Sequence, residues 1–262
     1  MLHDADAIDD ATMLGFARET SLSETTFVQS PTQPGADFRN RIWTVGGEIP
    51  FAGHPSLGTA VAVAHQRGDA EADYVQETLS GLQPIHVELS GERARASMLQ
   101  NPAQLGRRMD RADVAAAAGL RVADMHPELA PQVVSTGQPH LMAPVRDPEA
   151  LDRALPAFAR FMALMHVAQA MVLYLVACDG DSGKAYARGF FGYPGVVQED
   201  AATGSAAGPL CAYLHEHIGI SAVDIEQGVA MGRPSRLHTE IEDDRVRVGG
   251  DVVVLATGTL LV

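Results

Sequence analysis

The sequence predicts an α+β fold of two pseudo-symmetric halves, each with an antiparallel barrel-like sheet wrapped around one central helix. Three pairs of strand-like segments are separated only by short turns, which indicates hairpins and therefore antiparallel sheets. Two further segments, 54–66 and 203–217, are helical and apolar on every side, so we expect protein to surround each of them. A short motif repeated before both segments indicates that the two halves are related.

The remaining elements follow from local patterns. An apolar stripe at helical spacing predicts the first helix. Asp110 opens an alanine-rich helix that Gly119 ends, and an Asp-Pro pair opens a helical stretch that Pro156 interrupts. In chain order, we expect helices at 9–20, 110–119 and 147–166, a strand at 25–29, hairpins at 83–89 with 93–99, 172–178 with 184–191 and 237–242 with 245–249, and a final strand at 252–262.

The repeated motif runs from Glu48 to Ala60 and again from Glu199 to Gly208. Each copy passes from an acidic residue to a glycine followed by a polar residue, and then enters a helix of small residues. The start of a helix exposes unpaired N–H groups and the positive end of the helix dipole. We expect both starts to face one active cleft between the halves, where they would bind a carboxylate or an enolate-like oxygen. Acid–base side chains beside them would then form a proton-transfer site.

Composition and charge exclude several classes of protein. The 262 residues carry a formal net charge of −14, which would repel nucleic acids and anionic membranes. No apolar run approaches the ~20 residues that cross a bilayer, and the acidic first residues do not form a signal peptide. Cys178 and Cys211 are too few for a zinc motif, and the loop at 179–183 has its glycine in the wrong place for calcium. These features fit a cytoplasmic enzyme without metal or cofactor, and they also fit many other proteins.

Several motifs together resemble the PhzF-like phenazine-biosynthesis family over nearly the whole chain. They lie at 22–28, 48–55, 135–141, 199–206, 227–228, 231–235 and 248–250. The resemblance implies the diaminopimelate epimerase fold, a homodimer, and a cofactor-free isomerase that acts on a small carboxylated metabolite. The characterised member of the family moves a proton on a dihydro-hydroxyanthranilate ring.

The resemblance also implies where the two halves lie in the sequence. We expect an N-terminal half of residues 1–105 plus 251–262 and a C-terminal half of residues 106–250. Members of the family usually begin with a strand that this sequence lacks. The resemblance therefore implies an exposed sheet edge in the N-terminal half, an open pocket, or a start of the sequence that is misplaced.

Carried over residue by residue, the resemblance implies three catalytic side chains. Glu24 matches the family's acid–base in the motif Leu-Ser-Glu-Thr, and it would take a proton from one carbon and return it at another. Asp200 matches a second acid, which would orient or protonate the substrate, and His54 would assist. Without the resemblance, Glu24 would be read as an exposed carboxylate and His54 and Asp200 as parts of helix caps.

The resemblance further implies that the two helix starts bind the substrate. The N–H groups of Gly53 and His54, and those of Gly204 and Ser205, would bind its oxygens. Arg233 would either pair with a substrate carboxylate or brace the cleft. Both motifs lack the cysteines that epimerase relatives use as acid and base, so carboxylate chemistry is favoured.

Two other functions remain open from the sequence. Ser205, His54 and Asp200 could form a hydrolase triad, although the chain has no Gly-x-Ser-x-Gly motif. A module that binds a small molecule or a protein without catalysis is the other alternative.

Overall fold

The structure of the protein, a computed structural model, describes residues 1–91, 93–179 and 182–259. It divides into two compact units. Unit 1 comprises Met1–Leu99 and Gly249–Val262, and unit 2 comprises Gln100–Val248. Residues 180–181 of the loop considered for calcium lie outside the described residues.

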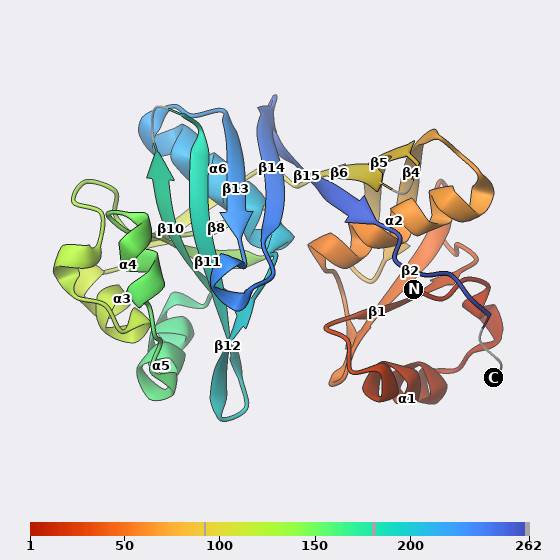
Figure 1. Cartoon of the computed structure of the whole chain (residues 1–262), viewed down its shortest axis with the longest axis horizontal. Helices are drawn as coiled ribbons and strands as arrows, with labels where there is room; N and C mark the ends of the chain where they lie inside the picture. The colour runs from red at the N-terminus through yellow and green to blue at the C-terminus, as the bar shows by residue number, and fades with distance from the viewer. Residues whose placement is uncertain (92, 180–181, 260–262) are drawn as a thin grey trace. The chain divides into compact units, whose positions relative to one another are not determined.

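Unit 1 is a sheet that surrounds the helix α2 (Figure 1). Its elements are η1 (Ala5–Ala7), α1 (Asp10–Thr20), β1 (Thr25–Gln29), β2 (Phe38–Thr44), β3 (Gly47–Ile49), α2 (Gly53–Arg67), β4 (Glu71–Thr78), β5 (Gly81–Ser90), β6 (Arg93–Leu99) and the end of β15 (Arg245–Val253). The strands follow the order β1-β2-β4-β5-β6-β15, with β3 paired to β2. The α2 side chains Ala60, Val61 and Ala64 are buried against this sheet. On the other face, α1 packs on Phe27 and Trp43.

Unit 2 has the same arrangement around α6 and carries additional helices. Its elements are β7 (Gln104–Arg108), α3 (Arg111–Ala118), η2 (Val122–Asp124), β8 (Gln132–Ser135), β9 (Pro139–Pro144), α4 (Pro148–Arg153), α5 (Phe158–Ala168), β10 (Val172–Asp179), β11 (Lys184–Tyr193), β12 (Val196–Asp200), α6 (Gly204–Ile218), β13 (Ala222–Gln227), η3 (Val229–Met231), β14 (Ser235–Glu242) and the start of β15. The strands follow the order β15-β14-β13-β11-β10-β9-β8-β7, with β12 paired to β11.

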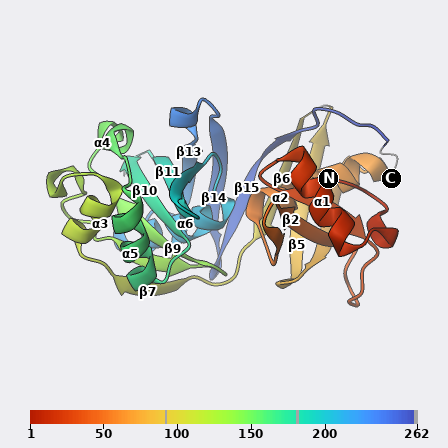
Figure 2. The same ribbon diagram turned by 90° about the horizontal axis from the view of Figure 1, so that it is seen from below.

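Two cores lie on opposite faces of the unit 2 sheet. Figure 2 shows the ribbon of this sheet with its helices. Leu173 and Leu175 of β10 pack on the core that α3, α4 and α5 cover, whereas Tyr174 and Val176 pack on the core around α6. Because successive side chains of a strand point to opposite faces, a strand buried on both faces reads as one continuous apolar run. This explains why 172–178 contains almost no polar residue.

The two units share an order of elements that the sequence motif only partly displays. The series β1–β2–β3–α2–β4–β5–β6 corresponds to β10–β11–β12–α6–β13–β14–β15. In each series the first two strands pair antiparallel, and the second strand pairs parallel with the strand that follows the helix. A parallel pair needs a long crossover, and here α2 or α6 supplies it. The predicted fold of two similar halves is therefore confirmed, although the sheets also contain parallel pairs.

The predicted helices and hairpins are present, with small differences at their ends, but the predicted last strand is wrong. Only its first two residues belong to β15, which ends at Val253. Residues 254–259 have no regular structure, and Leu255 is 92% exposed. Residues 260–262 of the predicted strand lie outside the described residues. An apolar alternation makes a strand only where a neighbouring strand accepts its hydrogen bonds.

The first residues of the chain cover part of the edge of β1. Leu2 pairs with β1, since its N–H donates to Thr26 O at 2.8 Å and its carbonyl accepts from Val28 N at 2.8 Å. In the described part of the chain, no helix is long and apolar enough to span a membrane.

Candidate active site

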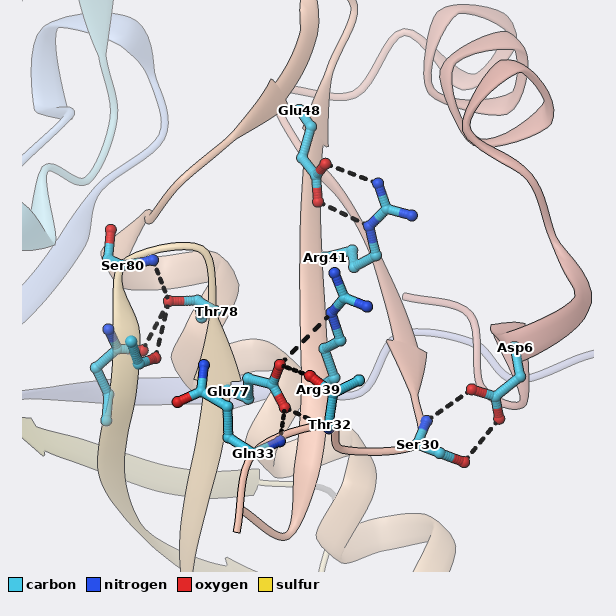
Figure 3. A network of polar contacts seen from close by, with 12 residues as sticks. Asp6, Ser30, Thr32, Gln33, Arg39, Arg41, Glu48, Glu77, Thr78 and Ser80 are labelled. Carbon is cyan, nitrogen blue, oxygen red and sulfur yellow. Dashed lines mark hydrogen bonds and ion pairs between the residues drawn. The ribbon is translucent and has the colours of Figure 1, made fainter. Parts of the chain in front are cut away.

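An arginine and a glutamate form a clamp immediately before α2. Arg41 of β2 donates to both carboxylate oxygens of Glu48 in β3, at 2.8 and 2.7 Å (Figure 3). Its guanidinium also lies 5.3 Å from the ring centre of Trp43 and donates to Asp10 of α1 at 2.7 Å. Only 11% of the Arg41 side chain and 16% of the Glu48 side chain are exposed, so water screens this bidentate pair weakly. The clamp fixes β3 next to the start of α2.

Unit 2 contains the same clamp before α6. Arg188 of β11 donates to both oxygens of Glu199 in β12, at 2.9 and 2.7 Å, and its guanidinium lies 4.9 Å from the ring centre of Phe190. In both units the aromatic residue stands two positions after the arginine, and the glutamate stands five positions before the helix. Both helices are 15 residues long. The internal repeat therefore includes the strands that hold the acidic residue of each motif.

The structure brings Glu24 and His54 together in unit 1. Glu24 precedes β1 and His54 is in the first turn of α2, and Thr59 ties the two elements by donating to Thr26 Oγ1 at 2.7 Å. His54 Nε2 lies 2.9 Å from Glu24 Oε2. That oxygen is buried. No donor among the described residues meets the angular criteria for a hydrogen bond to it, although His54 Nε2 is close enough for an ion pair. The Glu24 carboxylate is thus desolvated on one side and in contact with an imidazole.

In unit 2, the start of α6 is open to an acceptor from outside the helix. Thr203 occupies the N-cap position, but its side chain does not cap the helix; it donates instead to Asp200 Oδ2 at 2.9 Å. The N–H groups of Gly204 and Ser205 find no acceptor among the described residues. A helix start of this kind attracts an anion. Thr203 thus links Asp200 to the start of α6, where Gly204 and Ser205 lie.

The start of α6 is also held by Gln100, the first residue of unit 2. Gln100 donates to the carbonyl of Gly204 at 3.0 Å, and Thr136 donates to the Gln100 side-chain oxygen. Gln100 and Thr136 are both buried. The first turn of α6 is thereby held by residues distant in sequence, which keeps its N–H groups in a fixed direction.

Arg233 lies in the turn that packs beside Asp200. Its N–H donates to Gly228 O at 3.0 Å, and a Cβ at Gly228 would lie 2.3 Å from Arg233 O and 2.7 Å from Ala201 O. With φ of +79°, Gly228 both turns the chain and lets it approach Ala201 closely. The Arg233 side chain is exposed, and it makes no ion pair within the described residues. The backbone of this turn braces the loop, which leaves the guanidinium available for a ligand.

His140 of β9 lies beside the start of α6, and the sequence analysis did not single it out. Its side chain is 1% exposed, and neither ring nitrogen has a hydrogen-bond partner among the described residues. Burial lowers the pKa of His140 to about 4, while the nearby Ser205 backbone acts in the opposite direction. The ring is therefore neutral at neutral pH and faces the first turn of α6. The only sequence signal was its place in the motif at 135–141.

A separate surface cavity lies in unit 1. Its volume is about 490 Å³, and its polar lining includes Asp6, Asp37 and Arg67. These groups already brace the fold: Asp6 accepts from Ser30, Asp37 accepts from Val75 N, and Arg67 donates to Asp37 O (Figure 3 shows the first pair). None of the predicted site residues lines this cavity.

A family model, curated relatives and solved structures all match this chain over nearly its whole length. Residues 1–258 match the family described as "Phenazine biosynthesis-like protein". A Pseudomonas aeruginosa protein named trans-2,3-dihydro-3-hydroxyanthranilate isomerase is 34% identical, over 97% of this chain and 90% of that protein. The solved structure of a predicted epimerase from Pseudomonas aeruginosa is 35% identical, with a TM-score of 0.80 over 98% of this chain and 92% of that one.

More distant structures share the fold. A Bacillus anthracis phenazine biosynthesis protein of the PhzF family gives a TM-score of 0.83 at 25% identity, over 98% of this chain and 91% of that one. A probable proline racemase from Agrobacterium radiobacter, at 11% identity, gives a TM-score of 0.64 over 97% of this chain and 82% of that one. At that identity the likeness concerns the fold alone.

Proposed function

The chain belongs to the family of phenazine biosynthesis-like proteins and is an isomerase, and we propose that it moves a proton on a small carboxylated metabolite by carboxylate acid–base catalysis. The family resemblance predicted from the motifs is confirmed by the match over residues 1–258. The mechanism and the residues below are our proposal.

The contact between Glu24 and His54 carries the proposal. With 19% of its side chain exposed, Glu24 is accessible to a substrate, yet one of its oxygens is buried 2.9 Å from His54 Nε2. Glu24 takes the proton from one carbon of the substrate and returns it at another. His54 balances the charge of the carboxylate while the proton is on the substrate. Proton transfer by a group positioned in this way contributes ~10²–10⁴ in rate.

The start of α6 supplies the second part of the proposed mechanism. Removing a proton beside a carbonyl or a conjugated acid places negative charge on the substrate, and N–H groups at a helix start stabilise such charge. Gly204 and Ser205 provide these groups in unit 2, and Gly53 and His54 provide the equivalent groups in unit 1. Asp200 orients or protonates the substrate, and Arg233 pairs with its carboxylate.

The first substrate to test is the compound named for the relatives, trans-2,3-dihydro-3-hydroxyanthranilate. The wild-type protein, incubated in D₂O, is expected to convert it to an isomer that carries solvent deuterium, as measured by NMR. Glu24→Gln is expected to lower the rate by about 10²–10⁴-fold. Glu19→Gln is the matched control, because Glu19 is an exposed carboxylate on α1.

Other results would contradict the proposal in different ways. Equal rates for Glu24→Gln and wild type would remove Glu24 from the mechanism. Folded wild-type protein that binds cyclic carboxylic acids without exchanging any proton would indicate a binding module. Labelling of Ser205 by a fluorophosphonate would indicate a hydrolase; against that alternative, His54 contacts Glu24 and Asp200 accepts from Thr203. We also keep the cytoplasmic homodimer as a proposal, tested by fractionation and light scattering.

A further inference from the structure

Gln227, the last residue of β13, is buried next to Asp200 and uses its whole hydrogen-bonding capacity. It is 0% exposed. Its Oε1 accepts from the Tyr174 hydroxyl at 2.8 Å and from Thr203 N at 3.2 Å. Its Nε2 donates to Asp200 O at 2.7 Å and to Thr203 Oγ1 at 2.8 Å. A side-chain amide has two protons to donate and one oxygen with two lone pairs, so all four positions are filled.

The partners fix the orientation of the Gln227 amide. Thr203 N–H can only donate, and the Asp200 carbonyl can only accept. Exchanging the oxygen and nitrogen of the amide would place two donors together at Thr203 N and two acceptors together at Asp200 O. The amide therefore has one orientation consistent with its surroundings.

This orientation determines where the hydroxyl protons lie. Because Gln227 Nε2 donates to Thr203 Oγ1, the single proton of that hydroxyl is directed to its other partner, Asp200 Oδ2, at 2.9 Å. In the same way, the proton of Tyr174 is directed to Gln227 Oε1. The result is a chain of donors with one direction, from Tyr174 through Gln227 and Thr203 to the Asp200 carboxylate. Hydrogen bonds aligned in a chain polarise and strengthen one another.

The sheet is shaped to accommodate this chain. Tyr174 pairs with Gly189 and Gly189 pairs with Asp200 in register across β10, β11 and β12. A Cβ at Gly189 would lie 2.6 Å from Thr203 Oγ1 and 3.3 Å from Gln227 Nε2. The absence of a side chain at Gly189 leaves the space that the Thr203 hydroxyl occupies.

We propose that Gln227 is a positioning residue for the isomerase reaction, which directs the Thr203 hydroxyl to Asp200 and so fixes the orientation of its carboxylate. This inference rests on the proposed role of Asp200. It assigns Tyr174 and Thr203 to the same chain, and none of these three residues contacts the substrate in the mechanism proposed above.

Kinetics of isomerisation of trans-2,3-dihydro-3-hydroxyanthranilate test the chain. Thr203→Val, which keeps the shape but removes the hydroxyl, is expected to lower kcat about 10- to 100-fold with little change in KM. Thr203→Ser restores a hydroxyl and is expected to recover most of the activity. In the Asp200→Asn background, Thr203→Val is expected to add no further loss, because its effect passes through Asp200. Independent, additive losses would overturn the proposal.

Comparing variants of two buried tyrosines distinguishes an effect on the orientation of Asp200 from an effect on the stability of the fold. Tyr174→Phe and Tyr213→Phe each remove a buried hydroxyl, but Tyr213 donates to Ala130 O, outside the chain. We expect both variants to lower the melting temperature, and only Tyr174→Phe to lower kcat. Equal kcat values for the two would indicate a purely structural role for the chain.

A measurement without substrate tests the direction of the protons. Neutron diffraction from the deuterated protein is expected to show the Thr203 deuteron between Oγ1 and Asp200 Oδ2. A deuteron on the side of Gln227 would overturn the inference whatever the substrate is. Conversely, an inactive wild type with the expected deuteron would contradict the proposed function and leave the hydrogen-bond chain intact.

Discussion

His54 Nε2 lies 2.9 Å from Glu24 Oε2, and this contact joins the first turn of α2 to the residue before β1. The two side chains differ in exposure, since 48% of His54 but only 19% of Glu24 is exposed. The imidazole therefore covers one side of the carboxylate, and the arrangement suits a carboxylate that exchanges a proton with a substrate.

Replacing His54 tests this contact. His54→Gln is expected to lower kcat about 100-fold or less, because the carboxylate of Glu24 remains but loses the group that balances its charge. Steady-state kinetics with the deuterium assay measure the effect. His65→Gln is the control, since His65 is exposed on the same helix. Similar kcat values for both variants would show that His54 takes no part.

Replacing Ser205 tests whether the first turn of α6 binds the substrate. Ser205→Ala removes the hydroxyl but keeps the backbone N–H groups, so we expect the loss of one hydrogen bond to the substrate, about 1 kcal/mol or about fivefold in kcat/KM. Rates measured at low substrate concentration give this ratio directly. A loss of several orders of magnitude would instead indicate that Ser205 is a nucleophile, as a hydrolase requires.

Replacing Arg233 distinguishes a side chain that binds the substrate from one that only stabilises the loop. The turn is held by backbone contacts at Gly228, so Arg233→Ala is expected to leave the melting temperature unchanged. If the guanidinium binds a substrate carboxylate, KM rises about tenfold or more. A lower melting temperature with an unchanged KM would assign the side chain to the brace.

The clamps of Arg41 and Arg188 are expected to stabilise the fold. Replacing either arginine by lysine keeps the charge but removes the bidentate geometry, at a cost of about 1–3 kcal/mol in the free energy of unfolding. Urea unfolding measures it. The control is Arg247→Lys, whose pair with Glu242 is 38% and 47% exposed and should matter by less than about 0.5 kcal/mol. Equal effects would mean that burial does not strengthen the clamps.

His140 predicts a pH dependence of stability. Burial lowers its pKa to about 4 from the ordinary value of 6.5, so the unfolded chain binds a proton between these values and the folded chain does not. The free energy of unfolding should therefore fall as the pH drops from about 6.5 to about 4, by up to about 3 kcal/mol. Unfolding curves of wild type and His140→Leu, measured across this range, should differ in slope.

Local patterns in the sequence predicted much of the fold. The helix at 9–20 and the strand at 25–29 depend on short-range signals, and the structure has them as α1, capped by Asp9, and β1. The motifs before α2 and α6 were visible for the same reason. The last strand was predicted wrongly because the described residues after Val253, 254–259, belong to no strand, a fact that no local pattern contains.

The rest of the site depends on contacts between distant residues. Arg41 and Glu48 are joined by a tighter hairpin than Arg188 and Glu199, so the two clamps have no common spacing in the sequence. Gln227 meets Tyr174 only because β10, β11 and β13 lie side by side. His140 stands in an apolar run, where a buried histidine without a partner looks like any core residue.

The division of β15 between the two units has a consequence for synthesis on the ribosome. Unit 2 is continuous, whereas unit 1 needs residues from both sides of it: Arg95 of β6 pairs with Asp251, at 3.4 Å. Every segment of unit 2 has been made before the last strand of unit 1 exists. Because domains fold as their segments emerge, we expect unit 2 to mature first. In unit 1, β6 pairs with β5, but its other edge is expected to stay unpaired until the end of β15 has been made.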